Sequence, residues 1–251
     1  KVIDAVVNDS PGIPTVVSFW PHPREVLYGE TRLRLDLPEE KTSLLAPLGV
    51  EQLVLIPFDL SLAALGPKEF VEKILIRTLH AKRIAVGANF RFGKNREGDS
   101  DTLKELGNMN GIEVVILPIL NDSSGRISSS RIRSSLEEGN IKTAEKFMGR
   151  PYRFQGNVVQ GKGIGKDLGW PTANLQVDGR KFLPGLGVYA ALAWVNGKGN
   201  PFEAIMNLGP QPTIDPASPS AVEVHLLDQD INLSGLNLII EPIQRIRGQK
   251  R

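Results

Sequence analysis

The feature that most constrains the fold of this chain is a change in the rhythm of its apolar residues near residue 150. Before that point, short β-branched runs alternate with amphipathic segments, whereas after it strand-like runs follow one another between Gly, Pro, Asn and Asp. A chain of 251 residues is long enough to bury two separate cores. We therefore expect two domains, residues 1–150 and 151–251.

The first half has the alternation of a doubly wound α/β fold. Strands that alternate with helices at this spacing predict a parallel sheet covered by helices. Pro67 begins one amphipathic segment and Gly49 ends another, as expected at helix boundaries. We expect strands over 15–20, 52–58, 83–87 and 112–119, and helices over 39–49, 67–80, 101–111, 128–139 and 141–149.

The second half lacks helical periodicity after residue 149. Its apolar runs are short, alternate with polar residues and are bounded by turn-forming residues, which is typical of strands. Such a succession predicts an antiparallel sheet or a small barrel. The expected strands cover 152–161, 187–197, 202–209, 221–228 and 236–246, with a further strand after residue 172.

Composition excludes several functional classes. The 30 basic and 28 acidic residues leave a net charge of only +2, which argues against a broad binding surface for nucleic acid or anionic lipid. The absence of cysteine excludes disulfides and thiolate chemistry and fits a reducing compartment. No window has the roughly 18 uncharged apolar residues of a membrane span. We expect a cytoplasmic protein that binds small molecules, without nucleic-acid or membrane partners; the oligomeric state stays open.

The stretch GKGIGKDLGWPTANL, residues 161–175, is a candidate phosphate-binding loop. Its glycines let backbone N–H groups converge on an anion, and its lysines add positive charge. It is not a Walker A motif, because Asp167 follows Lys166 where Ser or Thr is required. From composition alone, a glycine-rich solvent loop with ordinary lysines is the simpler explanation. The candidate phosphate ligands are Gly161, Lys162, Gly163 and Gly165.

The end of this stretch adds a more specific signal. Pro171 fixes the backbone before Thr172, and strand alternation then places Thr172 and Asn174 on one face. The pair offers a hydroxyl and a carboxamide, which suit a hydrated Mg²⁺ ion and its phosphates. We therefore expect Thr172 and Asn174 to be metal ligands.

Several stretches together resemble the bacterial bifunctional riboflavin kinase/FMN adenylyltransferase family, also called FAD synthetases. They are GKGIGKDLGWPTANL, FLPGLGVYAA, NLGPQPTI and VEVHLLD in the second half, and FWPHPREVL, VGANFRFGKNREGD and ISSSRIR in the first. The resemblance runs from end to end in the family's order. It implies a nucleotidyltransferase-like α/β domain followed by a riboflavin kinase barrel. It also implies ATP and Mg²⁺, with riboflavin, FMN and FAD as substrates or products.

For the kinase half, the resemblance implies that Thr172 and Asn174 lie at the Mg-ATP site, with the glycine-rich loop over the phosphates. It implies that Glu223 is the catalytic base that takes the proton of the riboflavin 5′-hydroxyl. The residues alone leave an alternative open, because Glu223 and His225 share one face of a strand as any half-solvated strand would show.

For the adenylyltransferase half, the resemblance implies a nucleotide and flavin site at Asn89, Ser129, Ser130 and Arg133. Serines at a helix start cap free N–H groups, and the positive helix end together with Arg133 could hold a triphosphate. A purely structural capping role is the alternative. Ser130 stands where the family usually has threonine, and Trp20 where it more often has a small or acidic residue.

The family's adenylyl transfer rests on a His-x-Gly-His turn after the first strand, and no such turn is present in these 251 residues. We expect this sequence to be a fragment that also ends before the family's C-terminal helix. The sheet should then be incomplete and adenylylation lost. Two rival hypotheses are a riboflavin kinase with a vestigial first domain and a flavin-binding module without catalysis.

Overall fold

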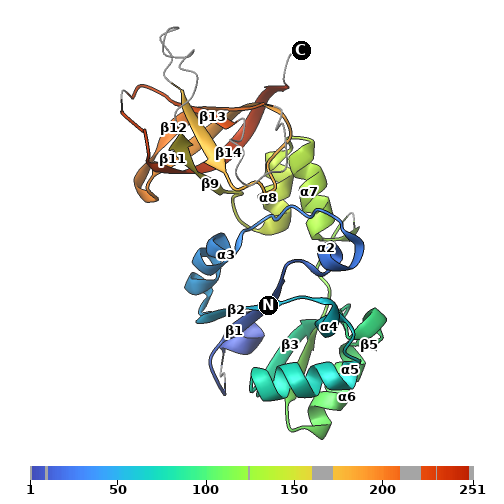
Figure 1. Ribbon diagram of the computed structural model, residues 1–251. Helices are drawn as coiled ribbons and strands as arrows, with labels where there is room; N and C mark the ends of the chain where they lie inside the picture. Colours follow the sequence, from blue (N-terminus) through green and yellow to red (C-terminus); the bar gives the residue numbers. More distant parts are fainter. Residues whose placement is uncertain are drawn as a thin grey trace. The chain divides into compact units, whose positions relative to one another are not determined.

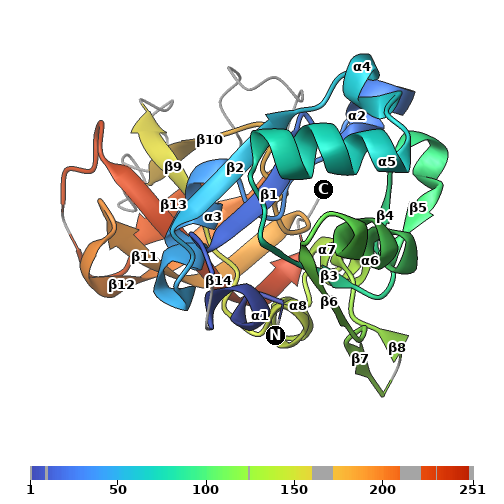
Figure 2. The ribbon, with the colours of Figure 1, turned by 90° about the horizontal axis from the view of Figure 1, so that it is seen from below.

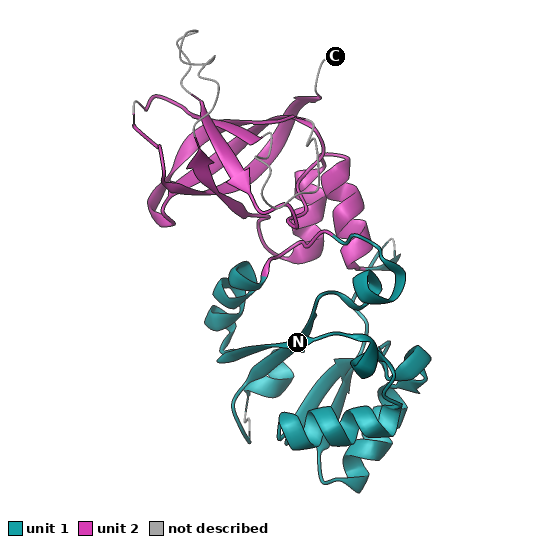
Figure 3. Cartoon of the chain, in the orientation of Figure 1, with its two compact units in different colours: residues 1–32, 38–126 teal, residues 33–37, 127–251 magenta. Residues whose placement is uncertain are grey.

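The computed structural model describes residues 2–8, 11–123, 125–159, 172–209, 222–229 and 231–248. They form two compact units, one of residues 1–32 and 38–126 and the other of residues 33–37 and 127–251 (Figure 3). The second unit therefore includes the two helices that precede residue 150. The boundary of the activities near residue 150 stays a prediction, because the segment that carries an activity need not coincide with a compact unit.

The first unit contains parallel strands in two separate pairs. β1 (Thr15–Trp20) runs parallel to β2 (Gln52–Pro57), and the two lie side by side in Figure 2. β3 (Arg83–Gly87) runs parallel to β6 (Glu113–Leu117). The predicted α/β unit with parallel strands is confirmed, but its sheet is small and partial.

A continuous amphipathic helix supplies much of the core of the first unit. α5 (Pro67–Phe70) passes directly into the π-helical segment η2 (Val71–Thr78), so the predicted helix over 67–80 is confirmed. Its start is fixed by Pro67 and by the Glu69 carboxylate, which accepts a hydrogen bond from the Gly66 N–H (3.2 Å). Phe70 and Val71 are buried with Leu103, which is only 1% exposed.

The other elements of the first unit are mostly short and connect or flank the strand pairs. They are α1 (Asp4–Val7), α2 (Pro23–Tyr28), α3 (Pro38–Leu45), η1 (Ala46–Leu48), α4 (Leu60–Ala63), β4 (Arg91–Phe92), η3 (Lys94–Arg96), β5 (Gly98–Asp99), α6 (Ser100–Met109), β7 (Asn121–Asp122) and β8 (Gly125–Arg126).

The second unit consists of two helices and a closed antiparallel barrel (Figure 1). The predicted barrel is confirmed, and its strands follow the order β10-β13-β12-β11-β14-β9. The helices are α7 (Ser129–Glu137) and α8 (Ile141–Met148). The strands are β9 (Phe154–Val159), β10 (Ala173–Val177), β11 (Gly187–Val195), β12 (Lys198–Leu208), β13 (Val222–Leu226) and β14 (Asn237–Gly248).

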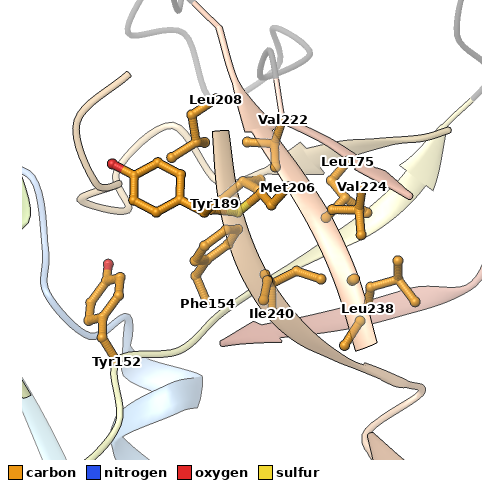
Figure 4. Close-up of a cluster of buried hydrophobic side chains, with 14 of the residues drawn as sticks. Tyr152, Phe154, Leu175, Tyr189, Met206, Leu208, Val222, Val224, Leu238 and Ile240 are labelled. Atoms are coloured by element: carbon orange, nitrogen blue, oxygen red, sulfur yellow. The ribbon is translucent and has the colours of Figure 1, made fainter. Parts of the chain in front are cut away.

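Alternation along the strands fills the barrel interior with apolar side chains. Leu175, Tyr189, Met206 and Leu238 point inward from four different strands and are fully buried (Figure 4). Each such side chain contributes about 1.5–3 kcal/mol relative to an exposed one. The alternate residues of β10, β12 and β13 are therefore held on the outer face of the barrel, where the candidate kinase residues lie.

Residues 33–37 form a short strap that belongs to the second unit. The Arg34 N–H donates to the Arg180 carbonyl (2.7 Å), and the Phe182 N–H donates to the Arg34 carbonyl (2.8 Å). One guanidinium nitrogen of Arg150 donates to both carboxylate oxygens of Asp36, at a distance of 2.7 Å to each. The sequence LRLDL alternates like a strand, but we predicted no element there.

Within the described ranges, no helix is both long and apolar enough to cross a membrane.

Candidate active site

Three polar side chains form a row across adjacent barrel strands. Glu223 of β13 lies directly opposite Asn174 of β10 on one side and opposite Asn207 of β12 on the other. Their chain neighbours, such as Val222 and Val224, are buried in the barrel, whereas the three row residues are half-buried on its outer face. Side chains directly opposite on antiparallel strands have Cβ atoms about 4.5–5.5 Å apart. The register therefore places Asn174 and Glu223 beside each other on the outer face of the barrel.

The side chains of this row have no hydrogen-bond or ion-pair partner among the described residues. Half-buried polar groups usually find partners, because leaving a desolvated donor or acceptor unpaired costs about 1–3 kcal/mol. Glu223 faces two carboxamides and no cation in the register of the strands. Within the part of the chain that the structure describes, no side chain therefore competes with a ligand for these three groups.

The row lies at one end of the barrel. Val159 at the end of β9 is the partner of Asn174, and Leu208 at the end of β12 is the partner of Val222 at the start of β13. Thr172 is exposed and directly precedes β10. The predicted phosphate ligands Gly161, Lys162, Gly163 and Gly165 lie outside the described residues, as does the segment 210–221.

A cavity of about 220 Å³ lies beside this end of the barrel. Its lining includes Leu208 and Val222, the residues next to Asn207 and Glu223, and it is mostly apolar. Strap residue Leu33 also lines it. The Tyr189 hydroxyl donates to the carbonyl of Gly185, another lining residue, and burial raises the pKa of Tyr189. Tyr189 is therefore a neutral donor that fixes the cavity wall.

In the first unit, Asn89 follows β3 at its carboxyl end, where parallel sheets usually bind ligands. When its carboxamide oxygen faces Arg126, Asn89 accepts hydrogen bonds from both terminal guanidinium nitrogens (3.1 and 2.8 Å). The bonds connect the loop after β3 to the β7–β8 hairpin. They leave the Asn89 amide nitrogen facing away from Arg126.

The helix-start residues belong to the second unit. The Ser128 hydroxyl accepts from the Arg131 N–H (3.4 Å) and so caps α7, while Ser129 and Ser130 begin its first turn and are exposed. Arg133 donates to the Leu33 carbonyl (3.2 Å) and lies 5.8 Å from the centre of the Phe182 ring. In this structure Arg133 therefore binds the strap. Asn89 belongs to the other unit, so the four predicted adenylyltransferase residues are divided between the two units.

Sequence reasoning missed Asn207. The residue is part of the stretch NLGPQPTI that carries the family resemblance, but it was given no role. The signal was the alternation in FEAIMNLG, which puts Asn207 on the same outward face as Glu203 and Ile205. Only the strand register reveals that it adjoins Glu223.

Comparison with known proteins shows the family of both units. A FAD synthetase family model matches residues 1–131, and a riboflavin kinase family model matches residues 148–251. The bifunctional riboflavin kinase/FMN adenylyltransferase of Escherichia coli (strain K12) is 34% identical over 237 residues, which make up 94% of this chain and 75% of the relative. The chain belongs to the bifunctional riboflavin kinase/FMN adenylyltransferase family.

A further relative and a solved structure are also similar to this chain. The bifunctional riboflavin kinase/FMN adenylyltransferase of Bacillus subtilis (strain 168) is 33% identical over 243 residues, with 94% of this chain and 75% of the relative covered. A crystal structure described as a macrolide-efflux protein from Streptococcus pneumoniae has a TM-score of 0.82 at 30% identity and covers 94% of this chain and 76% of that one. The bifunctional riboflavin kinase/FMN adenylyltransferase family makes this chain a transferase of FAD biosynthesis.

Proposed function

We propose that the barrel unit transfers the γ-phosphoryl group of ATP to the 5′-hydroxyl of riboflavin, which gives FMN and ADP. The cross-strand pair of Asn174 and Glu223 carries this proposal. It sets an oxygen ligand of the kind that Mg-ATP requires directly beside a carboxylate that can accept a proton. The match to the riboflavin kinase family model over residues 148–251 supports it independently.

The donor set at the start of β10 fits a Mg²⁺ ion that is shared with ATP phosphates. Thr172 offers a hydroxyl and Asn174 a carboxamide oxygen, and neither side chain is bonded to another described residue. Mg²⁺ needs few protein oxygens when phosphates and waters complete its coordination. No group of three or more His, Cys, Asp or Glu within the described ranges could form an all-protein metal site. When bound, the ion would neutralise developing phosphate charge.

Glu223 is proposed as the general base. The riboflavin 5′-oxygen forms the new bond to the γ-phosphorus, the bond from that phosphorus to the bridging oxygen of ADP breaks, and the hydroxyl proton passes to the Glu223 carboxylate. A positioned base of this kind contributes roughly 10²- to 10⁴-fold to the rate. Because the carboxylate has no internal partner among the described residues, it is open to the substrate hydroxyl.

The test is the substitution Glu223→Gln in the 251-residue chain. We expect turnover of riboflavin to FMN to fall by about 10²- to 10⁴-fold, because glutamine keeps the shape but cannot take the proton. Riboflavin affinity, followed by the quenching of its fluorescence, should change little. The matched control is Glu203→Gln, which alters an exposed carboxylate on the outer face of β12. Unchanged turnover in Glu223→Gln would exclude the base role and favour a binding module without catalysis.

We further propose that Asn89, Ser129, Ser130 and Arg133 are the nucleotide- and flavin-binding residues that a continuous sheet would use in adenylyl transfer to FMN, the second activity in the relatives' name. In this chain the parallel strands of the first unit form two separate pairs. Because nucleotide sites of such folds sit at the carboxyl ends of a continuous sheet, we expect no adenylylation here.

A further inference from the structure

Asn207 occupies the position on the far side of Glu223 from Asn174. β13 lies between β10 and β12, and the register places the three side chains in one line across the strands. Neighbouring strands are about 4.8 Å apart, so each member of the line is one strand spacing from the next. The base is thus flanked symmetrically by two carboxamides.

A valine bounds the three polar residues at each end of this row. Val159 is the next outward residue beyond Asn174, and Val188 is the next beyond Asn207. On β12 itself, the preceding outward residue is Ile205. Apart from Glu223, the outward neighbours of Asn207 named here are apolar, and its half-buried side chain has no partner among the described residues. Such an asparagine is badly placed for a merely structural role.

The proposed reaction assigns the two sides of Glu223 to different substrates. If Thr172 and Asn174 hold the phosphate donor, in-line transfer requires the acceptor alcohol to approach from the opposite direction. The opposite direction along the line is that of Asn207. The acceptor must therefore extend over Asn207 while its terminal hydroxyl reaches Glu223.

We propose that Asn207 binds a hydroxyl group of the polyol chain of the acceptor flavin and so selects polyhydroxylated acceptors. A carboxamide both donates and accepts hydrogen bonds, so it can pair with a hydroxyl group in either direction. Unlike the Glu223 carboxylate, a carboxamide cannot act as a base at neutral pH. This inference rests on the proposed kinase function and adds to it a determinant of acceptor specificity.

The experiment compares two flavins that differ only in the middle of the side chain. Riboflavin and 10-(5-hydroxypentyl)-7,8-dimethylisoalloxazine share the ring and the terminal hydroxyl, but the second lacks the internal hydroxyls. Dissociation constants are measured by fluorescence titration of the 251-residue chain with Mg²⁺ and ADP present. We expect the wild type to prefer riboflavin by about tenfold, the value of one or two net hydrogen bonds. Asn207→Leu should abolish that preference.

Two further variants make the result decisive. Asn207→Thr replaces the carboxamide by a hydroxyl, which also donates and accepts hydrogen bonds, and threonine suits a strand, so this variant should retain part of the preference. Asn157→Leu makes the same change at an exposed barrel asparagine bonded to Asn237 (3.1 Å) and should leave the preference intact. Equal affinity of the wild type for both flavins, or an unchanged preference in Asn207→Leu, would overturn the assignment.

Failure of this inference is distinguishable from failure of the kinase proposal. The preference is a ratio of binding constants and needs no turnover, whereas the role of Glu223 is judged from the loss of turnover at little-changed riboflavin affinity. A loss of stability would weaken both flavins equally and leave their ratio unchanged.

Discussion

At the scale of single residues, the second unit carries a carboxyl group whose ionisation opposes folding. Glu145 of α8 is partly buried, and this burial raises the pKa of its side chain, with the nearby Glu241 carboxylate adding to the effect. The Tyr152 N–H opposes the shift by donating to the carboxylate. The ionised form is therefore less favourable in the folded state than in the unfolded chain.

We expect Glu145→Gln to stabilise the protein at neutral pH. A folded-state pKa above the unfolded value means that the penalty is fully present above the folded pKa and disappears below the unfolded one. Glutamine can still accept the Tyr152 N–H. Urea unfolding at pH 7.5 should show a higher midpoint than the wild type, and the difference should vanish near roughly pH 4, the ordinary range of glutamate. A gain that persists at pH 4 would point to packing as its cause.

Residue identity alone predicted the candidate kinase residues but not their surroundings. Thr172, Asn174 and Glu223 were chosen from motifs, and the strand register brings Asn174 and Glu223 together. Asn207 was not chosen, because which strand lies beside β13 is set by barrel closure and not by local pattern. The same applies to Lys181, which is only 1% exposed and donates to the carbonyls of Leu35 (2.6 Å) and Arg153 (2.9 Å). An isolated lysine in a sequence is normally expected in solvent.

At the scale of secondary structure, the segment 182–187, which joins β10 to β11, packs against the end of helix α7. The Gly185 N–H donates to the Leu136 carbonyl at the end of α7 (2.8 Å). A side chain on Gly185 would overlap the backbone of Glu137. The close approach of two backbones therefore requires glycine at this position.

We expect Gly185→Ala to lower the free energy of unfolding by about 1–3 kcal/mol or more, because the backbone of α7 cannot yield as a flexible side chain would. The measurement is chemical denaturation followed by circular dichroism. Gly12→Ala serves as the control, since no atom lies within 4 Å of its added Cβ and its φ is not positive. Equal effects of the two substitutions would show that the contact between Gly185 and α7 contributes nothing.

Element types were predictable because periodicity of the apolar residues reports them directly. The helix over 67–80 and the barrel strands follow from spacings of 3.6 and 2 residues. The strap was missed although Leu33, Leu35 and Leu37 alternate with polar residues. A run of five residues is too short to show which segment it pairs with. Its partner is the segment from Arg180 to Phe182, about 146 residues further along the chain.

At the scale of the whole molecule, the chain passes between its two units at residues 32/33, 37/38 and 126/127. A separation of the activities at residue 150 would leave the strap on the other fragment and remove its backbone hydrogen bonds with Arg180 and Phe182. The kinase unit is therefore built from two stretches of sequence. The change in the rhythm of apolar residues near residue 150 does not reveal that residues 33–37 belong to the second unit.

The way the strands of the first unit are paired bears on which flavins the chain makes from riboflavin. Within the described residues, β1 and β3 each have a single strand partner, and Val17 of β1 is 40% exposed. Such a sheet offers no continuous edge on which a triphosphate and a flavin could meet. Incubation of the chain with riboflavin, ATP and Mg²⁺, followed by chromatography, should therefore yield FMN without FAD.

The products distinguish the hypotheses for the two units. FMN alone fits a working barrel beside an inactive first unit, and added FMN should then also remain unconverted. FAD from FMN and ATP would show that two separate strand pairs suffice for adenylylation, which would contradict our account of the first unit. Absence of FMN while riboflavin still binds would contradict the kinase proposal, because binding without turnover is the behaviour of a flavin-binding module.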